Sequence, residues 1–69
     1  MSRLQILGQN IAYFRRQKGW SQEFLAEKAD LSREYVTRVE RGQKNISLKK
    51  LFLITDILGV KFSQLTNFD

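Results

Sequence analysis

The chain has 69 residues, with 12 basic and 7 acidic side chains and a net charge of +5. It has neither cysteine nor histidine, which excludes disulfides, thiolate metal sites and the commonest general base near neutral pH. No apolar run reaches the ~20 residues of a membrane span, and the N-terminus shows no signal-peptide pattern. We therefore expect one cytoplasmic domain, residues 1–69, without a metal ion or cofactor.

Serines and glycines mark the ends of the predicted helices. Three serines stand where an N-cap is needed, namely Ser21, Ser32 and Ser47. Three glycines follow helical runs, where a left-handed residue ends a helix at low cost, namely Gly19, Gly42 and Gly59. These signals predict five helices, at about 3–18, 21–29, 32–41, 47–58 and 62–67.

Apolar side chains recur at steps of three or four residues along these segments, as a helix with one buried face requires. The first segment has Leu4, Leu7, Ile11 and Phe14. The fourth has Leu48, Leu51, Ile54 and Leu58. This spacing predicts an all-α fold, a compact five-helix bundle around one small core.

The second and third segments together have the dimensions of a helix-turn-helix, with a short helix, a three-residue turn and a second helix. A small residue is needed where two helices cross closely, and Ala26 is placed there. Leu31, Val36 and Val39 are predicted to point inward and anchor the second helix. Its outward positions are then Arg33, Glu34, Tyr35, Thr37 and Arg38.

Most of the excess positive charge lies in one segment. Residues 32–50 contain six basic and two acidic side chains, a net of +4, and the other 50 residues have a net of +1. This distribution favours a surface that binds a polyanion over a uniformly charged one.

The fourth segment is more apolar than one buried stripe requires, because it also contains Phe52, Leu53 and Ile57. Helix five and the C-terminal residues 66–69 could cover this excess. The alternative, which we favour for so short a chain, is a dimer interface. Its predicted residues are Phe52, Leu53, Ile57, Phe62 and Phe68.

The run "WSQEFLAEKADLSREYVTRVERG" resembles the Cro/C1, or Xre-type, helix-turn-helix family, and the resemblance extends over residues 4–66. Its most specific parts are Ser21-Gln22, Ala26, "VERG" ending at Gly42, and "LGV" at 58–60. The run "REYVTRVERGQKNISLKKL" is most similar to the controller proteins of restriction–modification systems. The resemblance implies a lambda-repressor-like DNA-binding domain. Asp30 stands where the family often has glycine, and aspartate tolerates the left-handed conformation.

The resemblance implies that the helix after Ser32 enters the major groove and meets base edges. Arg33 is the first candidate for guanine, and Arg38 is a candidate for a base or a phosphate. Tyr35 is a candidate for a thymine methyl or a phosphate, and Thr37 is a weaker one. Glu34 could accept a bond from cytosine, orient an arginine, or stabilise the helix N-terminus. The alternative for Arg33, Arg38 and Tyr35 is that they are solvated groups on an exposed helix face.

Phosphate contacts are expected from residues around this helix, and such contacts set register without reading sequence. The candidates are Gln22, Ser32, Gln43, Lys44, Asn45, Ser47 and Lys49. The resemblance also implies an ion pair between Arg15 and Glu40, which would join the first helix to the third.

The leading hypothesis is a transcriptional regulator that binds double-stranded DNA as a homodimer on a palindromic operator, with no small-molecule ligand. The second is an antitoxin or adaptor whose main role is to bind another protein through the apolar face. An enzyme is poorly supported, since histidine, cysteine and a glycine-rich phosphate loop are all missing.

Overall fold

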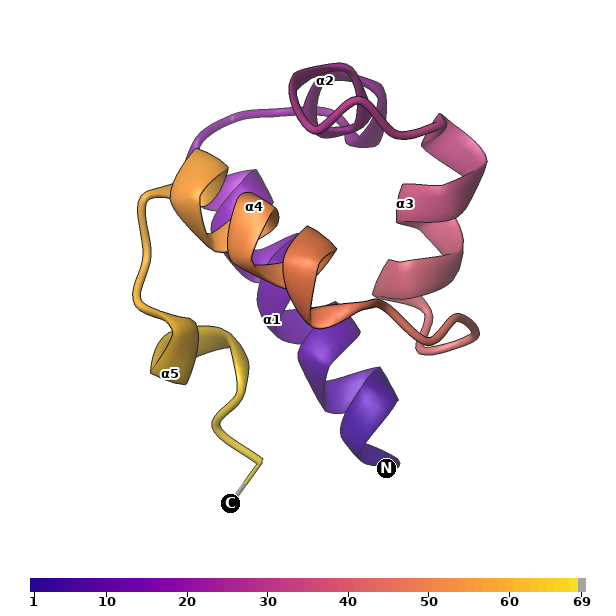
Figure 1. Ribbon diagram of the computed structural model, residues 1–69, viewed down its shortest axis with the longest axis vertical. Helices are drawn as coiled ribbons and strands as arrows, with labels where there is room; N and C mark the ends of the chain where they lie inside the picture. The colour runs from indigo at the N-terminus through magenta and orange to yellow at the C-terminus, as the bar shows by residue number, and fades with distance from the viewer. Residues whose placement is uncertain (69) are drawn as a thin grey trace.

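Five helices follow one another in the computed structural model, which describes residues 1–68 (Figure 1). They are α1 (Arg3–Gln17), α2 (Gln22–Lys28), α3 (Arg33–Glu40), α4 (Leu48–Leu58) and α5 (Phe62–Leu65). No strand occurs in this part of the chain. The all-α prediction is confirmed, and each predicted helix end agrees to within two residues. Asp69, the last residue of the predicted domain, lies outside the described residues.

Serine side chains begin four of the five helices. The Oγ atoms of Ser21, Ser32 and Ser47 accept hydrogen bonds from backbone N–H groups three residues later, at 3.0, 3.0 and 3.2 Å. Ser2 caps α1 in the same way, at 3.1 Å from the nitrogen of Gln5. The Gln5 side chain accepts a return bond from the Ser2 N–H at 2.8 Å. This capping box fixes the start of α1, and it is not among the predicted caps.

The turn between α2 and α3 contains the single non-glycine residue with a positive φ among residues 1–68. This residue is Asp30, with φ of 55°. The left-handed conformation predicted for it is confirmed. The chain can therefore turn sharply between α2 and α3, as a helix-turn-helix requires.

The core lies where the five helices meet, and α1 runs through the middle of the arrangement (Figure 1). Each helix contributes one of the largest fully buried side chains, which are Ile11, Leu25, Val36, Ile54 and Leu65. Removing such a side chain leaves a cavity that several neighbouring helices line. Each helix is therefore held in place by the same small core.

One expectation for α4 is wrong. Leu48 was assigned to the core, but it is 62% exposed because it lies in the first turn of α4, at the edge of the buried stripe. Thr55 is polar, yet it is buried in the same helix. Its hydroxyl donates to the carbonyl oxygen of Phe52 at 2.6 Å, so burial costs it no hydrogen bond.

Gly8 in α1 lies directly against α3. A Cβ atom at this position would collide with the backbone carbonyl oxygens of Val39 and Glu40. The sequence predicts roles for the other three glycines only. The close approach of α1 to the C-terminal end of α3 depends on Gly8.

Trp20 lies in the connection between α1 and α2 and is half-buried. The ammonium groups of Lys18 and Lys28 lie 5.1 and 5.3 Å from the centre of its ring, within the range of cation–π attraction. The Phe24 ring packs edge-on against it at 5.2 Å. These contacts hold the tryptophan against the corner between the two helices.

Candidate nucleic-acid interface

Helix α3 divides into a buried side and an exposed side. Val36 and Val39 are 2% and 3% exposed and pack into the core. Arg33, Glu34 and Arg38 are exposed on the opposite side. The predicted division is confirmed for these residues, because the valines anchor the helix and both arginines point to solvent.

The exposed charges of α3 include one weak ion pair. Glu34 Oε1 lies 4.0 Å from Arg38 Nε, one helical turn away, and both side chains are more than half exposed. A pair of this kind is worth little in water. The carboxylate can bias the position of the Arg38 guanidinium, but it leaves the arginine free to turn to another anion.

Tyr35 is half-buried and lies next to two lysines from other parts of the chain. Lys44 Nζ, in the loop after α3, is 5.6 Å from the ring centre, and Lys50 Nζ, in α4, is 4.6 Å from it. These distances lie within the range of cation–π attraction. The contacts join α3, the loop after it and α4 at one surface. Lys44 and Lys49 are predicted contact residues, whereas Lys50 is not among them, because only the fold places it beside α3.

The remaining backbone-contact candidates surround α3. Gln43, Lys44 and Asn45 are exposed in the loop, and Lys49 is exposed in the first turn of α4. Ser32 and Ser47 are exposed, and their hydroxyl oxygens accept capping bonds. An accepting hydroxyl still has its own proton to donate. These residues therefore offer donors on the flanks of α3.

The predicted ion pair between Arg15 and Glu40 is present and is buried. The guanidinium donates from Nε to Glu40 Oε2 at 2.7 Å and from Nη2 to Oε1 at 3.0 Å. Its Nη1 donates to the carbonyl oxygen of Trp20 at 2.8 Å. The two residues are 7% and 8% exposed. This bidentate pair fastens α1 to the C-terminal end of α3.

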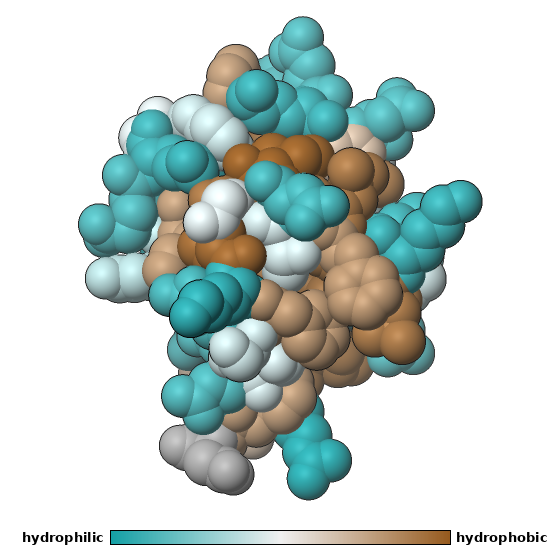
Figure 2. All heavy atoms as spheres, turned by 60° about the vertical axis from the view of Figure 1, so that its left-hand side comes forward, coloured by the Kyte–Doolittle hydropathy of each residue, from teal (hydrophilic) through white to brown (hydrophobic). Residues whose placement is uncertain are grey.

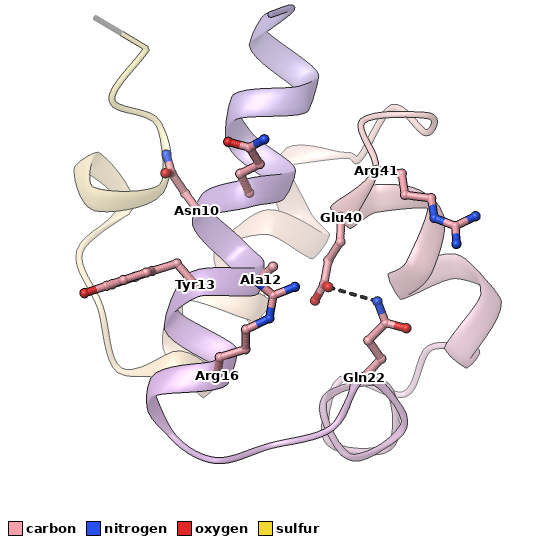
Figure 3. Close-up of a pocket in the computed structure, with 8 residues that line it drawn as sticks. Asn10, Ala12, Tyr13, Arg16, Gln22, Glu40 and Arg41 are labelled. Atoms are coloured by element: carbon pink, nitrogen blue, oxygen red, sulfur yellow. Dashed lines mark hydrogen bonds between the residues drawn. The ribbon is translucent and has the colours of Figure 1, made fainter.

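Gln22 belongs to the same network, and its side chain is half-buried, not free at the surface. Nε2 donates to Glu40 Oε1 at 3.0 Å, as Figure 3 shows. Its Oε1 accepts the hydroxyl of Thr37 at 2.8 Å. The half-buried Thr37 also lies 2.9 Å from the carbonyl oxygen of Arg33. Gln22 and Thr37 are predicted as separate contact residues, and the fold joins them by a hydrogen bond.

A groove of about 590 Å³ lies beside this network, between α1 and the α2–α3 pair (Figure 3). Gln22 and Glu40 form part of its wall, and the exposed side chains of Arg16 and Arg41 also line it. Neither arginine was among the sequence-predicted site residues. Both add positive charge next to Gln22.

A second surface lies on α4 and the C-terminal segment. Phe52, Leu53, Phe62 and Phe68 are 50%, 42%, 37% and 37% exposed. The rings of Phe52 and Phe62 pack together at 5.2 Å. Figure 2 shows hydrophobic side chains gathered on one side of the molecule. Ile57 differs from the others, because it is partly buried against the core.

Two other features concern residues 1–68, namely metal-binding groups and membrane-spanning helices. Histidine, cysteine and carboxylate side chains do not come together there in any group of three that could bind a metal ion. None of the five helices is both long enough and apolar enough to cross a bilayer.

Comparison with known proteins agrees with this geometry. The family model HTH_3, described as helix-turn-helix, matches residues 11–65. A hypothetical transcription factor of Neisseria meningitidis is 45% identical over 60 residues, which are 87% of this chain and 57% of the relative. The control protein C.BamHI of Bacillus amyloliquefaciens is 39% identical over 64 residues, which are 91% of this chain and 79% of the relative.

Two solved structures extend the comparison. The restriction–modification controller C.AhdI of Aeromonas hydrophila is 40% identical, with a TM-score of 0.85 over 90% of this chain and 94% of that one. The biofilm regulator SinR, solved in complex with DNA, is 35% identical, with a TM-score of 0.80 over 86% and 95% of the two chains. This chain has the lambda-repressor-like fold and belongs to the helix-turn-helix (HTH_3, Cro/C1-type) family of DNA-binding transcriptional regulators.

Proposed function

We propose that the chain is a sequence-specific regulator that acts as a homodimer on a palindromic operator, with α3 of each copy in the major groove. The observation that carries this proposal is the division of α3 into two sides. Two buried valines fix the helix to the core, and two arginines extend from its opposite side. A helix anchored in this way can enter a groove about 12 Å wide without disturbing the core.

Base reading is assigned to the exposed side chains of α3. Arg33 lies in its first turn, where recognition helices approach base edges, and its guanidinium can bond guanine O6 and N7 together. Arg38, biased by Glu34, is assigned to a second base or the adjacent phosphate. The Tyr35 ring is assigned to a thymine methyl, and Glu34 either accepts a bond from cytosine or orients Arg38.

Backbone binding is assigned to residues on both sides of α3. The loop residues Gln43, Lys44 and Asn45, together with Ser47 and Lys49, supply donors on one side. Gln22 and Ser32 supply them at the helix-turn-helix. Lys50, Arg16 and Arg41 add positive charge next to these positions. Each phosphate neutralised in this way should make binding more dependent on salt.

Dimerisation is assigned to the apolar face on α4 and the C-terminal segment. One α3 reads only a few base pairs, too few to select a genomic site among many competitors. Two copies related by a two-fold axis would place their recognition helices about 34 Å apart, one turn of DNA. Each copy measures 29 by 22 by 22 Å, which suits this spacing for two subunits side by side.

The similarity to C.BamHI and C.AhdI suggests the genes that this chain regulates. Both relatives are control proteins of restriction–modification systems by name. We therefore assign the chain to control of such an operon, in the cytoplasm, where bacterial promoters are transcribed. A restriction–modification operon next to its gene would support this assignment.

Selection of bound sites from a random DNA pool tests the proposal most directly. We expect a palindromic site with half-sites about one turn apart, and cooperative gel shifts over a dilution series. Sedimentation of the protein alone should give a dimer. A pool without an enriched sequence, or a strictly monomeric titration, would contradict the proposal.

The exposed aromatic side chains favour one alternative, an adaptor or antitoxin that mainly binds another protein. SinR, which shares this fold at 33% identity, has been solved in a complex with SinI. Sedimentation separates the two possibilities, because a surface reserved for a different protein should leave the purified chain monomeric or aggregating. A tight homodimer that binds one DNA sequence would exclude this alternative.

A further inference from the structure

Thr37 is half-buried, and its side chain faces α2. Its Oγ1 lies 2.8 Å from Gln22 Oε1 and 2.9 Å from the carbonyl oxygen of Arg33. Both neighbours are oxygen acceptors, whereas a threonine hydroxyl has one proton to donate. The position of that proton decides what Thr37 can offer to DNA.

The Glu40 carboxylate determines where the proton lies. Glu40 accepts two bonds from Arg15 and presents Oε1 to Gln22, so the nitrogen of the Gln22 amide must face it, at 3.0 Å. The amide oxygen of Gln22 then faces Thr37. Since this oxygen has no proton, the Thr37 hydroxyl must supply the proton of the bond. The hydroxyl therefore has no proton left to donate to a base.

The result is a continuous chain of hydrogen bonds through three helices. It runs from Arg15 in α1 to Glu40 in α3, then to Gln22 in α2, and returns to α3 at Thr37. One Nε2 hydrogen of Gln22 is bound to Glu40. The second Nε2 hydrogen has no acceptor among residues 1–68, and it belongs to a side chain held at both of its ends.

We propose that Thr37 is a positioning residue, which holds the Gln22 amide so that its second N–H is directed to a DNA phosphate. Thr37 itself reads no base. The inference rests on the proposed function, in which Gln22 contacts the backbone beside α3. The phosphate contact of Gln22 is thereby coupled to the packing of α3 against α2. The contact forms in full only when α3 keeps this position.

Three variants test this proposal in site-selection and gel-shift experiments. Thr37→Val keeps the branched shape and removes the donor, Thr37→Ser keeps the donor, and Gln22→Ala removes the group that is positioned. We expect Thr37→Val to weaken binding roughly 3- to 10-fold, the range for one lost hydrogen bond. The loss should be the same for all sequences, with an unchanged selected site and an unchanged salt dependence, because the neutral Gln22 amide displaces no counterion. Thr37→Ser should bind within about 2-fold of the parent protein.

The double variant separates positioning from base reading. If Thr37 acts through Gln22, Thr37→Val should have no further effect in the Gln22→Ala protein. Relaxed preference at one operator position in Thr37→Val, persisting in the Gln22→Ala background, would overturn the proposal. Fully additive losses would overturn it as well.

A measurement on the free protein distinguishes failure of this inference from failure of the proposed function. The side-chain amide resonances of Gln22 should shift in Thr37→Val and return close to their original positions in Thr37→Ser. Resonances that stay unchanged in Thr37→Val would overturn the positioning role whether or not DNA binds. A parent protein that selects no DNA sequence would instead contradict the proposed function, and with it the phosphate contact.

Discussion

Gly8 of α1 packs against the backbone carbonyl of Val39 in α3, and the contact leaves no room for a side chain. Val39 is one of the two valines that anchor the recognition helix. The position of α3 therefore depends on glycine at position 8 of α1, as well as on the apolar side chains of α3 itself.

Gly8→Ala should destabilise the fold, although alanine is the better helix former by ~1 kcal/mol. The new methyl group would meet backbone atoms, which cannot rotate away, so α1 and α3 must separate. We expect a loss of about 2 to 3 kcal/mol in the free energy of unfolding, measured by urea denaturation. Gln9→Ala, at the next and exposed position of α1, is the control and should be nearly neutral. Equal stability of the two variants would contradict the close packing.

The buried pair of Arg15 and Glu40 should be far more sensitive to loss of one partner than to loss of both. Arg15→Met or Glu40→Met would leave a charge buried without its main partner, at a cost of about 3 to 5 kcal/mol. The double variant buries no charge and should cost less than the sum of the two single changes. A double-mutant cycle measured by thermal or urea unfolding gives the coupling. Additive losses would show that the two side chains act independently.

Arg33→Ala and Lys44→Ala should weaken DNA binding in different ways. Arg33 is assigned to a base, so its loss should relax preference at one position of each half-site and cost ~1 to 3 kcal/mol. Lys44 is assigned to a phosphate, so its loss should weaken all sequences alike and reduce the salt slope by about one per subunit. Site selection and gel shifts at several salt concentrations measure both effects. Swapped outcomes would reverse the two assignments.

Phe52→Asp should break the proposed dimer without unfolding the subunit, because the ring is half exposed in the single chain. A charge at the centre of an apolar interface is costly to bury, so we expect monomers in sedimentation at concentrations where the parent protein is dimeric. Operator affinity should fall at least about tenfold, since each half-site would bind alone. Tyr13→Asp alters an aromatic residue in α1 that is 55% exposed and serves as the control. If Tyr13→Asp also yields monomers, the interface lies elsewhere.

The local part of this structure could be read from the sequence. Ser21, Ser32 and Ser47 all cap helices as predicted, and Asp30 takes the left-handed conformation of the turn. Such signals act within a few residues of one another, so their consequences do not depend on the rest of the chain. Helix order followed from them, whereas the two sides of α3 followed from the inward positions of Val36 and Val39.

The tertiary part could not be read in the same way. Leu48 fits the apolar spacing of α4, but it lies at the first position of that helix and its side chain is exposed. Gly8 looked like an ordinary helical glycine, because its neighbour in α3 is about 30 residues away in the chain. The bond between Gln22 and Thr37 likewise depends on how α2 crosses α3. The family resemblance supplied the Arg15–Glu40 pair, which spacing alone would not have given.

The placement of Trp20 gives the protein an intrinsic optical probe. It is the only tryptophan, its carbonyl oxygen accepts a bond from Arg15, and its ring lies beside two ammonium groups. Any event that disturbs the Arg15–Glu40 pair should therefore change the polarity around one indole. Emission excited at the indole absorption band would follow such an event in real time, in unlabelled protein and at concentrations low enough to separate subunits.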